Sequence, residues 1–343
     1  MSFLDKVSDV LFLGAGASRP LGKMLMYEFI GHLGNIPAVR DHPLFTDIVS
    51  KQSDLEYLLE QLSNIQDLHF IRYRLQGGSA TPIFARQATD SARKEESFEE
   101  LAESAAKLMA RIQGEVFVHY RAIEEANEHS IVKLLEPLIK NTHERSALPP
   151  VIFTTNYDPA IEKFCQLSMA YECVDGFANN TAAKSYEWRL ENYENHNTDR
   201  ERAIYLFKLH GSADWMKEFG RIVKGSTIYV EGDKEHTNMM IYPATRKIAY
   251  EEPYFSCYNY LEECLARAKR LLVIGYSFRD YDAVTRMRSA LRRNPDLKIE
   301  LVSRDAISLV QRLRKDFGIH AKPRTGSLAI GSPLPEIDPN FED

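Results

Sequence analysis

The segment Gly14–Ser18 combines glycines and a hydroxyl in a pattern that could hold a phosphate. It follows the apolar run Val10–Leu13, and Pro20 suits an early position in a helix after it. Glycine lets the backbone approach a ligand closely, and a helix start offers N–H groups to an anion. A tight turn without a ligand is the alternative, because Arg19 stands where the full dinucleotide fingerprint has its third glycine. The predicted pyrophosphate contacts are Gly14, Ala15, Gly16 and Ser18.

A second polar segment, Thr154–Pro159, ends the strand-like run Val151–Thr155. Asn156 carries both an acceptor and donors, so its amide can hold a ribose hydroxyl or a water molecule. Thr155 and Asp158 are further candidate ligand contacts beside it. For Asp158, capping of the next helix is the favoured alternative, because the residue directly precedes a proline.

His210 is the candidate general base of the sequence. It follows the apolar run Ile204–Phe207 and precedes Gly211, so its side chain can project into a cleft at the end of a strand. Histidine ordinarily titrates at a pKa of about 6.5, which suits proton transfer near neutral pH. A structural role is the alternative for any single histidine. Asn156 and His210 are therefore the two predicted catalytic residues.

Glycine and serine also follow two later apolar runs. Gly275 and Ser277 come after Leu271–Ile274, and Ser303 comes after Ile299–Val302. Gly275 and Ser277 are predicted nucleotide contacts, since their backbone N–H groups and hydroxyl lie at a strand end. Ser303 is a candidate contact to an adenosine ribose, with a plain turn residue as the alternative.

Alternating strands and helices must position these segments. Apolar runs predict parallel strands at 10–13, 151–155, 204–207, 271–274 and 299–302, with helices at 253–269, at 281–292 and from 305 onward. This alternation predicts an α/β fold with a doubly wound, Rossmann-like parallel sheet. Because ligands of such sheets bind beyond the carboxyl ends of the strands, the four segments are expected at one edge.

Leucine stripes between the first two strands predict a helical insertion in the nucleotide-binding domain. Within it, Ser53 and Glu56 are expected to form a capping box. The polar residues 176–202 are expected to form a long surface excursion, with a strand at 238–242 and a last short strand near Ile319. The predicted divisions are residues 1–37 with 146–330 (nucleotide binding), 38–145 (helical insertion) and 331–343 (C-terminal tail).

Amino-acid composition narrows which molecules the protein can bind and where in the cell it is expected. The net charge of -6 argues against nucleic acid as a direct partner, because duplex binding needs a basic face. The four cysteines form no CxxC pair, so they are interpreted as buried thiols and no metal is expected. The first residues lack the layout of a signal peptide, and no apolar run reaches the ~18 residues of a membrane span. A cytoplasmic protein without membrane contact is expected.

Together the four segments resemble the sirtuin-type NAD-binding domain, in the order Gly14–Ser18, Thr155–Asp158, His210–Gly211 and Gly275–Ser277. Sirtuin deacylases carry a zinc module with two CxxC pairs after the histidine, and this sequence has none. The Asn-Tyr-Asp and Gly-Tyr-Ser-Phe variants are more similar to the sirtuin-like NAD hydrolases of bacterial anti-phage defence.

That resemblance implies NAD as substrate, without a metal, and cleavage of its nicotinamide–ribose bond to deplete NAD in an infected cell. It also implies a homo-oligomer, and a DNA-translocating ATPase or helicase as a separate partner, because the sequence ends soon after the fold. Two rival functions stay open. One is NAD-dependent ADP-ribosyl transfer or deacylation, and the other is a non-catalytic NAD or ADP-ribose sensor in a partner complex.

Overall fold

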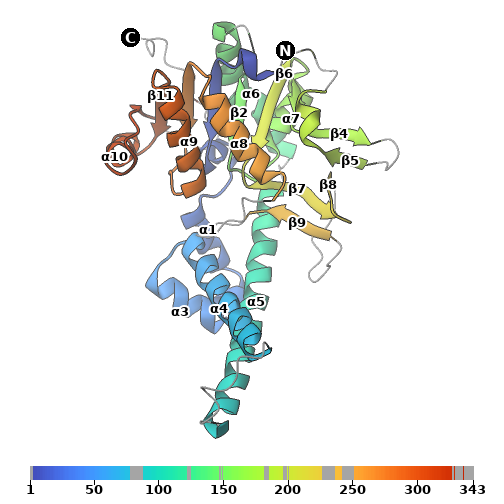
Figure 1. Ribbon diagram of the computed structural model, residues 1–343, viewed down its shortest axis with the longest axis vertical. Helices are drawn as coiled ribbons and strands as arrows, with labels where there is room; N and C mark the ends of the chain where they lie inside the picture. Colours follow the sequence, from blue (N-terminus) through green and yellow to red (C-terminus); the bar gives the residue numbers. More distant parts are fainter. Residues whose placement is uncertain are drawn as a thin grey trace. The chain divides into compact units, whose positions relative to one another are not determined.

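The computed structural model describes residues 3–77, 88–121, 125–146, 148, 150–180, 185–195, 199, 201–225, 236–241, 251–326, 328 and 335 (Figure 1). Most of the predicted C-terminal tail, 331–343, and part of the strand predicted at 238–242 lie outside these residues. The chain divides into two compact units. One consists of Met1–Met24, His119–Ile241 and Ile248–Asp343, and the other consists of Leu25–Val118 and Tyr242–Lys247.

The first unit contains a seven-stranded sheet in which all neighbouring strands are parallel, in the order β12-β11-β10-β1-β2-β6-β3. This confirms the predicted doubly wound, Rossmann-like α/β class. Its strands are β1 (Asp9–Leu13), β2 (Val151–Thr154), β3 (Glu172–Val174), β6 (Ala203–Lys208), β10 (Arg270–Ile274), β11 (Lys298–Ser303) and β12 (Lys322–Thr325). The last of them begins three residues after Ile319, near which a strand was predicted.

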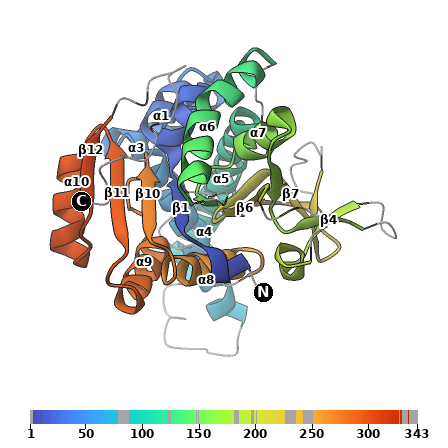
Figure 2. The same cartoon turned by 90° about the horizontal axis from the view of Figure 1, so that it is seen from above.

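Helices cover both faces of this sheet because its central strands are apolar on both sides. In β1, Val10 and Phe12 face one buried cluster and Leu11 and Leu13 face the other. Figure 2 shows the helices of the two clusters on opposite sides of the strands. The first cluster includes residues of α8 (Tyr254–Leu265), α9 (Tyr281–Arg293) and α10 (Ala306–Arg312), and the second includes residues of α6 (Glu125–Ser146) and α7 (Ala160–Ser168).

A second, antiparallel sheet lies in the same unit. The sequence analysis predicted only one of its strands, at 238–242, which overlaps the observed strand His236–Met240. The order of this sheet is β4-β5-β8-β7-β9, formed by β4 (Phe177–Asn180), β5 (Ser185–Trp188), β7 (Gly211–Glu218), β8 (Arg221–Lys224) and β9 (His236–Met240). The interpretation of 176–202 as a surface excursion was therefore wrong. Trp188 and Tyr193 of that segment are buried, and they pack with Phe207 and Trp215 in the first cluster.

The second unit is helical. It contains α1 (Met26–Leu33), α2 (Pro37–Arg40), α3 (Pro43–Lys51), α4 (Leu55–Gly77) and most of α5 (Ala88–Arg121). Its bounds differ from the predicted insertion of 38–145, because the leucines of α6 pack against the parallel sheet. The capping box predicted at Ser53 was also wrong. Instead, the Asp54 carboxylate accepts from the N–H groups of Glu56 and Tyr57 at the start of α4.

Short 3₁₀ turns connect several of these elements: η1 (Phe3–Lys6), η2 (Ala15–Leu21) and η3 (Leu190–Tyr193), with η4 (Leu313–Phe317) a single π-turn after α10. Pro20 lies inside η2, and α1 begins only at Met26. The expectation of one α-helix that starts around Pro20 was therefore wrong.

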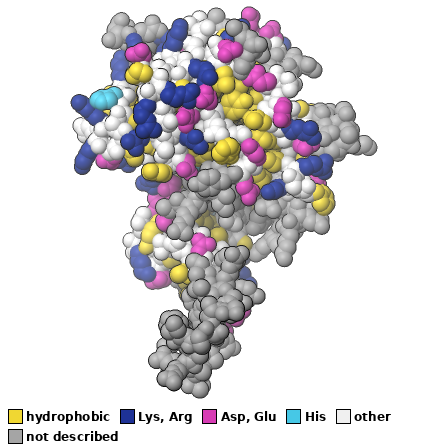
Figure 3. Space-filling model, viewed as in Figure 1, with side chains coloured by type: hydrophobic (Ala, Val, Ile, Leu, Met, Phe, Trp, Pro, Cys, Tyr) yellow, Lys and Arg dark blue, Asp and Glu magenta, His cyan; other side chains and the backbone are white. Residues whose placement is uncertain are grey.

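Surface charge in the sheet-containing unit is mixed. On the face drawn in Figure 3, basic and acidic side chains of this unit alternate, in keeping with the net charge of -6. Within the described part of the chain, no helix is both long and apolar enough to span a bilayer.

Candidate functional site

The carboxyl ends of β11, β10, β1, β2 and β6 meet at one edge of the parallel sheet, as the sequence predicts. Backbone hydrogen bonds continue the ladder beyond the strands. Gly14 N donates to Ile274 O at 2.9 Å, Thr155 N to Leu13 O at 3.2 Å, and Leu209 N to Thr154 O at 2.8 Å. The topology therefore brings all four predicted segments to the same edge.

The two glycine segments at this edge form one packed unit. Gly16 N donates to Gly275 O at 2.9 Å. A Cβ atom on Gly14 would lie 2.5 Å from the Cα of Tyr276, and one on Gly16 would lie 2.7 Å from the Cα of Gly275. Gly275 itself has a φ of +63°, which a side chain would disfavour. In this structure the glycines make room for neighbouring backbone. Contact of Gly14, Ala15, Gly16 and Ser18 with a pyrophosphate stays a prediction.

Asn156 belongs to a buried polar network that joins β2 to the first loop. Its Nδ2 donates to Gly14 O at 2.9 Å and to Ser18 Oγ at 2.7 Å. The Ser18 hydroxyl in turn donates to Asp158 Oδ2 at 2.6 Å, while Asp158 Oδ1 accepts from Ala160 N at 3.2 Å. Asp158 thus contacts both the start of α7 and the first loop. With both amide protons used, Oδ1 is the Asn156 atom suited to accept from a hydroxyl or a water molecule.

A small cavity adjoins this network. Its volume is about 20 Å³, and its lining includes Ser18, Asn156 and Asp158. A space of this size holds about one water molecule. The donor set suits the hydroxyls of a ribose, but a dinucleotide does not fit the cavity as it stands. Entry of a dinucleotide into this cavity would require the segments that line it to move apart.

His210 lies in a second buried network, with an acidic partner. Its Nε2 is 2.6 Å from Asp280 Oδ2, and the same oxygen accepts the hydroxyl proton of Tyr258 at 2.7 Å. The other oxygen, Oδ1, caps α9 by accepting from Asp282 N and Ala283 N. Burial, and then the charge of Asp280, raise the pKa of Tyr258 far above its ordinary value, so its phenol stays a donor.

This contact decides the tautomer of His210. An ionised carboxylate only accepts hydrogen bonds, so the proton of the neutral ring resides on Nε2, the atom that faces Asp280. His210 and Asp280 are both buried, which makes their charge-assisted contact stronger than it would be in water.

The Asn156 and His210 networks start from adjacent strand ends and run to opposite sides of the sheet. The first reaches η2, whose apolar residues pack with α6 and α7, and the second reaches α8 and α9. Between described residues, no hydrogen bond joins Asn156 to His210. A substrate that contacts both side chains would therefore lie across the rim of the sheet.

The other predicted contacts lie at the edge but outside these two networks. Ser277 is exposed, and its carbonyl accepts from Arg312. The Ser303 hydroxyl accepts from Asp305 N at 3.3 Å, which is the turn role given as its alternative. Thr155 is half-buried beside Asn156. Their contact with a nucleotide stays a prediction.

Asp280 and Tyr258 are the site residues that sequence reasoning did not assign. Asp280 follows the glycine turn at Gly275, and its capping position before α9 was a usable signal. Tyr258 gives no such signal, because only the packing of α8 brings it to this edge.

The parallel sheet, its glycine turns and the paired histidine and aspartate at the carboxyl edge define a Rossmann-like α/β protein. A model of the SIR2-like domain family matches residues 150–321, half of the chain. The chain belongs to this family. The matched range includes Asn156, His210 and Asp280, whereas Gly14–Ser18 precedes it.

Solved Sir2 structures resemble the chain at low identity. One is a Sir2 homologue in complex with 2'-O-acetyl ADP ribose, at 13% identity over 88% of this chain and 84% of that chain, with a TM-score of 0.39. Another is a Sir2 homolog–NAD complex, at 13% identity, 88% and 82% coverage, and a TM-score of 0.40. At this level of similarity, these structures add no evidence to the Rossmann-like fold that the strand order already shows. Among curated proteins, no sequence matches the chain.

Among the residues that the structure describes, no three His, Cys, Asp or Glu side chains are grouped as metal ligands. Three of the cysteines are buried and Cys173 is half-buried. Burial raises the pKa of the Cys257 and Cys264 thiols, so they stay protonated near neutral pH.

Proposed function

We propose that this chain is an NAD+ glycohydrolase that breaks the nicotinamide–ribose bond and releases nicotinamide and ADP-ribose. Membership of the SIR2-like family supports NAD as the substrate. The observation that carries the proposal is the placement of two preorganised polar networks at neighbouring strand ends. One presents the Asn156 amide, and the other presents an imidazole whose tautomer is fixed by Asp280.

The proposed reaction is a hydrolysis with water as the acceptor. The bond between C1′ of the ribose and the nicotinamide nitrogen breaks, and its electron pair leaves with the neutral nicotinamide. Positive charge develops on the ribose, as in glycoside cleavage. A water oxygen then bonds to C1′, and the proton that it loses goes to a base. The balance is NAD+ plus water giving nicotinamide, ADP-ribose and one proton.

Two side chains carry the proposed chemistry. Asn156 Oδ1 would orient a ribose hydroxyl or the attacking water, because Ser18 and the Gly14 carbonyl hold its Nδ2 in place. The imidazole of His210 would accept the proton, since Asp280 stabilises the imidazolium that forms. General acid–base help of this kind is worth about 10²–10⁴-fold in rate.

We also propose that the activity is gated and serves anti-phage defence by NAD depletion. The small cavity beside Asn156 supports gating, because substrate entry requires the edge to open. A homo-oligomer contact or a DNA-translocating ATPase partner would supply that opening. This keeps a cell from losing its NAD when the signal is absent.

The test of the proposed function is nicotinamide release by the wild type and by the variants Asn156→Ala and His210→Ala. Each variant is expected to lose about 10²-fold or more of the rate while keeping its circular dichroism spectrum. His320→Ala, at an exposed histidine, is the matched control and should keep full activity.

The products separate the rival functions. ADP-ribose bound to a protein would indicate transfer, and saturable NAD binding without release would indicate a sensor. Full activity in both site variants would end the proposed mechanism.

A further inference from the structure

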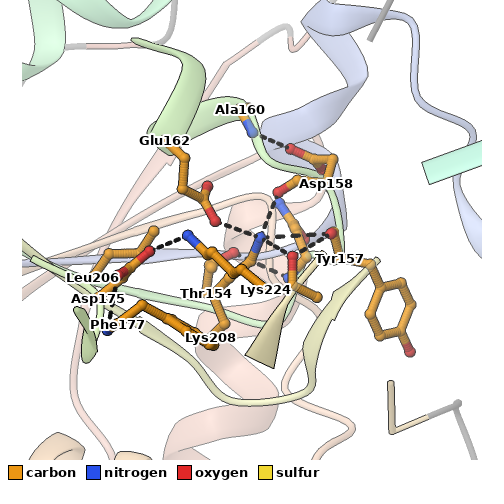
Figure 4. A network of polar contacts seen from close by, with 12 residues as sticks. Thr154, Tyr157, Asp158, Ala160, Glu162, Asp175, Phe177, Leu206, Lys208 and Lys224 are labelled. Carbon is orange, nitrogen blue, oxygen red and sulfur yellow. Dashed lines mark hydrogen bonds and ion pairs between the residues drawn. The ribbon is translucent and has the colours of Figure 1, made fainter. Parts of the chain in front are cut away.

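Lys208 places a fully buried ammonium group directly behind the Asn156 segment (Figure 4). Its Nζ donates to Asp158 O at 2.8 Å, to Ser212 Oγ at 2.6 Å and to Glu162 Oε1 at 3.1 Å. A fourth, longer contact joins Nζ to Tyr157 O at 3.5 Å. An ammonium has three protons, so the three shorter contacts use its full capacity. The side chain of Lys208 is 1% exposed and that of Glu162 is 7% exposed.

The contacts of Lys208 join three parts of the site. The Asp158 carbonyl belongs to the segment that carries Asn156, Glu162 belongs to α7, and Ser212 lies two residues after His210. Ser212 extends the connection, because its hydroxyl donates to Tyr157 O at 3.1 Å. The backbone on both sides of the site is thus held by one cation.

The connection to Asn156 continues through the side chain of Asp158. Lys208 fixes the backbone of Asp158, whose carboxylate accepts from Ser18, and Ser18 accepts from Asn156 Nδ2. A second, part-buried ion pair, Lys224 with Asp175, lies beside this group in Figure 4. Among the described residues, Lys224 and Asp175 make no hydrogen bond to the Tyr157 or Asp158 carbonyl. Lys208 therefore contacts the backbone of the Asn156 segment, and the Lys224–Asp175 pair does not.

We propose that Lys208 is a positioning residue for NAD cleavage, which holds the Thr155–Asp158 segment so that the Asn156 amide meets the ribose. This inference rests on the proposed function.

The physical reason lies in what a lysine supplies at this point. A buried ion pair is often no more stabilising than apolar side chains of the same volume. An apolar side chain, however, cannot donate to the Asp158 carbonyl or to Ser212. The donors therefore serve the geometry of the segment, and loss of that geometry should slow the chemical step more than it weakens binding.

The experiment removes the ion pair without leaving a buried charge. In the double variant Lys208→Met/Glu162→Met, both charges are lost and the volume is nearly kept. A matched control is the double variant Asp9→Leu/Arg270→Met, which removes a buried ion pair at the opposite end of the parallel strands. For each protein the unfolding midpoint, kcat, KM and amide hydrogen exchange are measured.

We expect the Lys208→Met/Glu162→Met variant to unfold within a few degrees of the control, with kcat lower by about 10²-fold and KM within a few-fold of the wild type. Amide exchange of residues 155–160 should be faster than in the wild type. A kcat within about three-fold of the wild type, or unchanged exchange in this segment, would overturn the proposal.

A milder variant decides the question if the double variant does not fold. Ser212→Ala removes the hydroxyl between Lys208 and the Tyr157 carbonyl and should lower kcat by about 10-fold. An unchanged kcat would count against Lys208. If the wild type releases no nicotinamide either alone or with a candidate ATPase partner, the proposed function fails, and hydrogen exchange in the same variants still shows whether Lys208 holds the segment.

Discussion

At the scale of single residues, the chemistry depends on how the imidazole of His210 is held. The Asp280 carboxylate contacts Nε2 at 2.6 Å and is itself fixed by Tyr258 and by two N–H groups of α9. This arrangement sets the tautomer and stabilises the protonated ring, the two roles that a buried aspartate has beside a catalytic histidine.

The variant Asp280→Asn tests this role. Its amide can donate to Nε2 and so favours the tautomer with the proton on Nδ1, which removes the base. Nicotinamide release is expected to fall by about 10²-fold or more. Tyr258→Phe, which keeps the contact between histidine and aspartate, should lose much less. A rate for Asp280→Asn equal to that of Tyr258→Phe would contradict the assignment.

Sequence alone could identify the polar residues that follow buried strands, but not their partners. Asn156 and His210 were found because each stands directly beyond an apolar run. The contact of Lys208 with Glu162 spans 46 positions, and that of Tyr258 with Asp280 spans 22. Such pairs depend on how helices pack over the sheet, and no local pattern records that packing.

At the scale of elements, an ion cluster joins α8 to α9, the helix that Asp280 caps. Arg293 donates to both oxygens of Glu263, at 2.5 and 3.2 Å, and Arg267 adds a further contact. These hydrogen bonds with Arg293 and Arg267 lower the pKa of Glu263 to about 2. The cluster is at the surface, so its contribution to stability is small.

The pH dependence of this cluster is a testable consequence. Because the folded-state pKa of about 2 lies below the ordinary value of 4.5, the stabilisation is present above pH 4.5 and is lost as the pH falls towards 2. Glu263→Gln should lower the free energy of unfolding by less than about 1 kcal/mol at pH 7. In urea titrations, this difference from the wild type should shrink between pH 4.5 and 2.

The control is Glu103→Gln, whose lysine partner lies on the same helix. It joins no two elements and should have a smaller effect at pH 7. A Glu263→Gln difference that grows as the pH falls would contradict the cause given for the pKa shift.

Most strands of the parallel sheet were predictable, whereas in the second sheet only the strand at 238–242 was predicted. Strands buried on both faces are continuous apolar runs, which local composition reveals. The antiparallel strands β4, β5, β8 and β9 have four or five residues each, and in β5 Tyr186 and Trp188 stand among charged residues. The strand β7 also begins at Gly211, directly after the candidate base, where the sequence suggested only a loop.

At the scale of the whole molecule, the parallel topology is what makes a site from distant segments. Strands β10, β1, β2 and β6 are neighbours in the sheet although they are far apart in sequence. Their carboxyl ends therefore place Gly14, Asn156, His210 and Gly275 at one edge. The SIR2-like family match covers all of these segments except the first.

The central claim is that water attacks C1′ of the NAD ribose at this edge of the sheet. The most direct test is to let the protein cleave NAD in ¹⁸O-labelled water and to analyse the products. Mass spectrometry should show nicotinamide and ADP-ribose in equal amounts, with one ¹⁸O on the ADP-ribose from the wild type. The same products should be nearly absent with His210→Ala. ADP-ribose without the label, or equal product from the variant, would contradict the account.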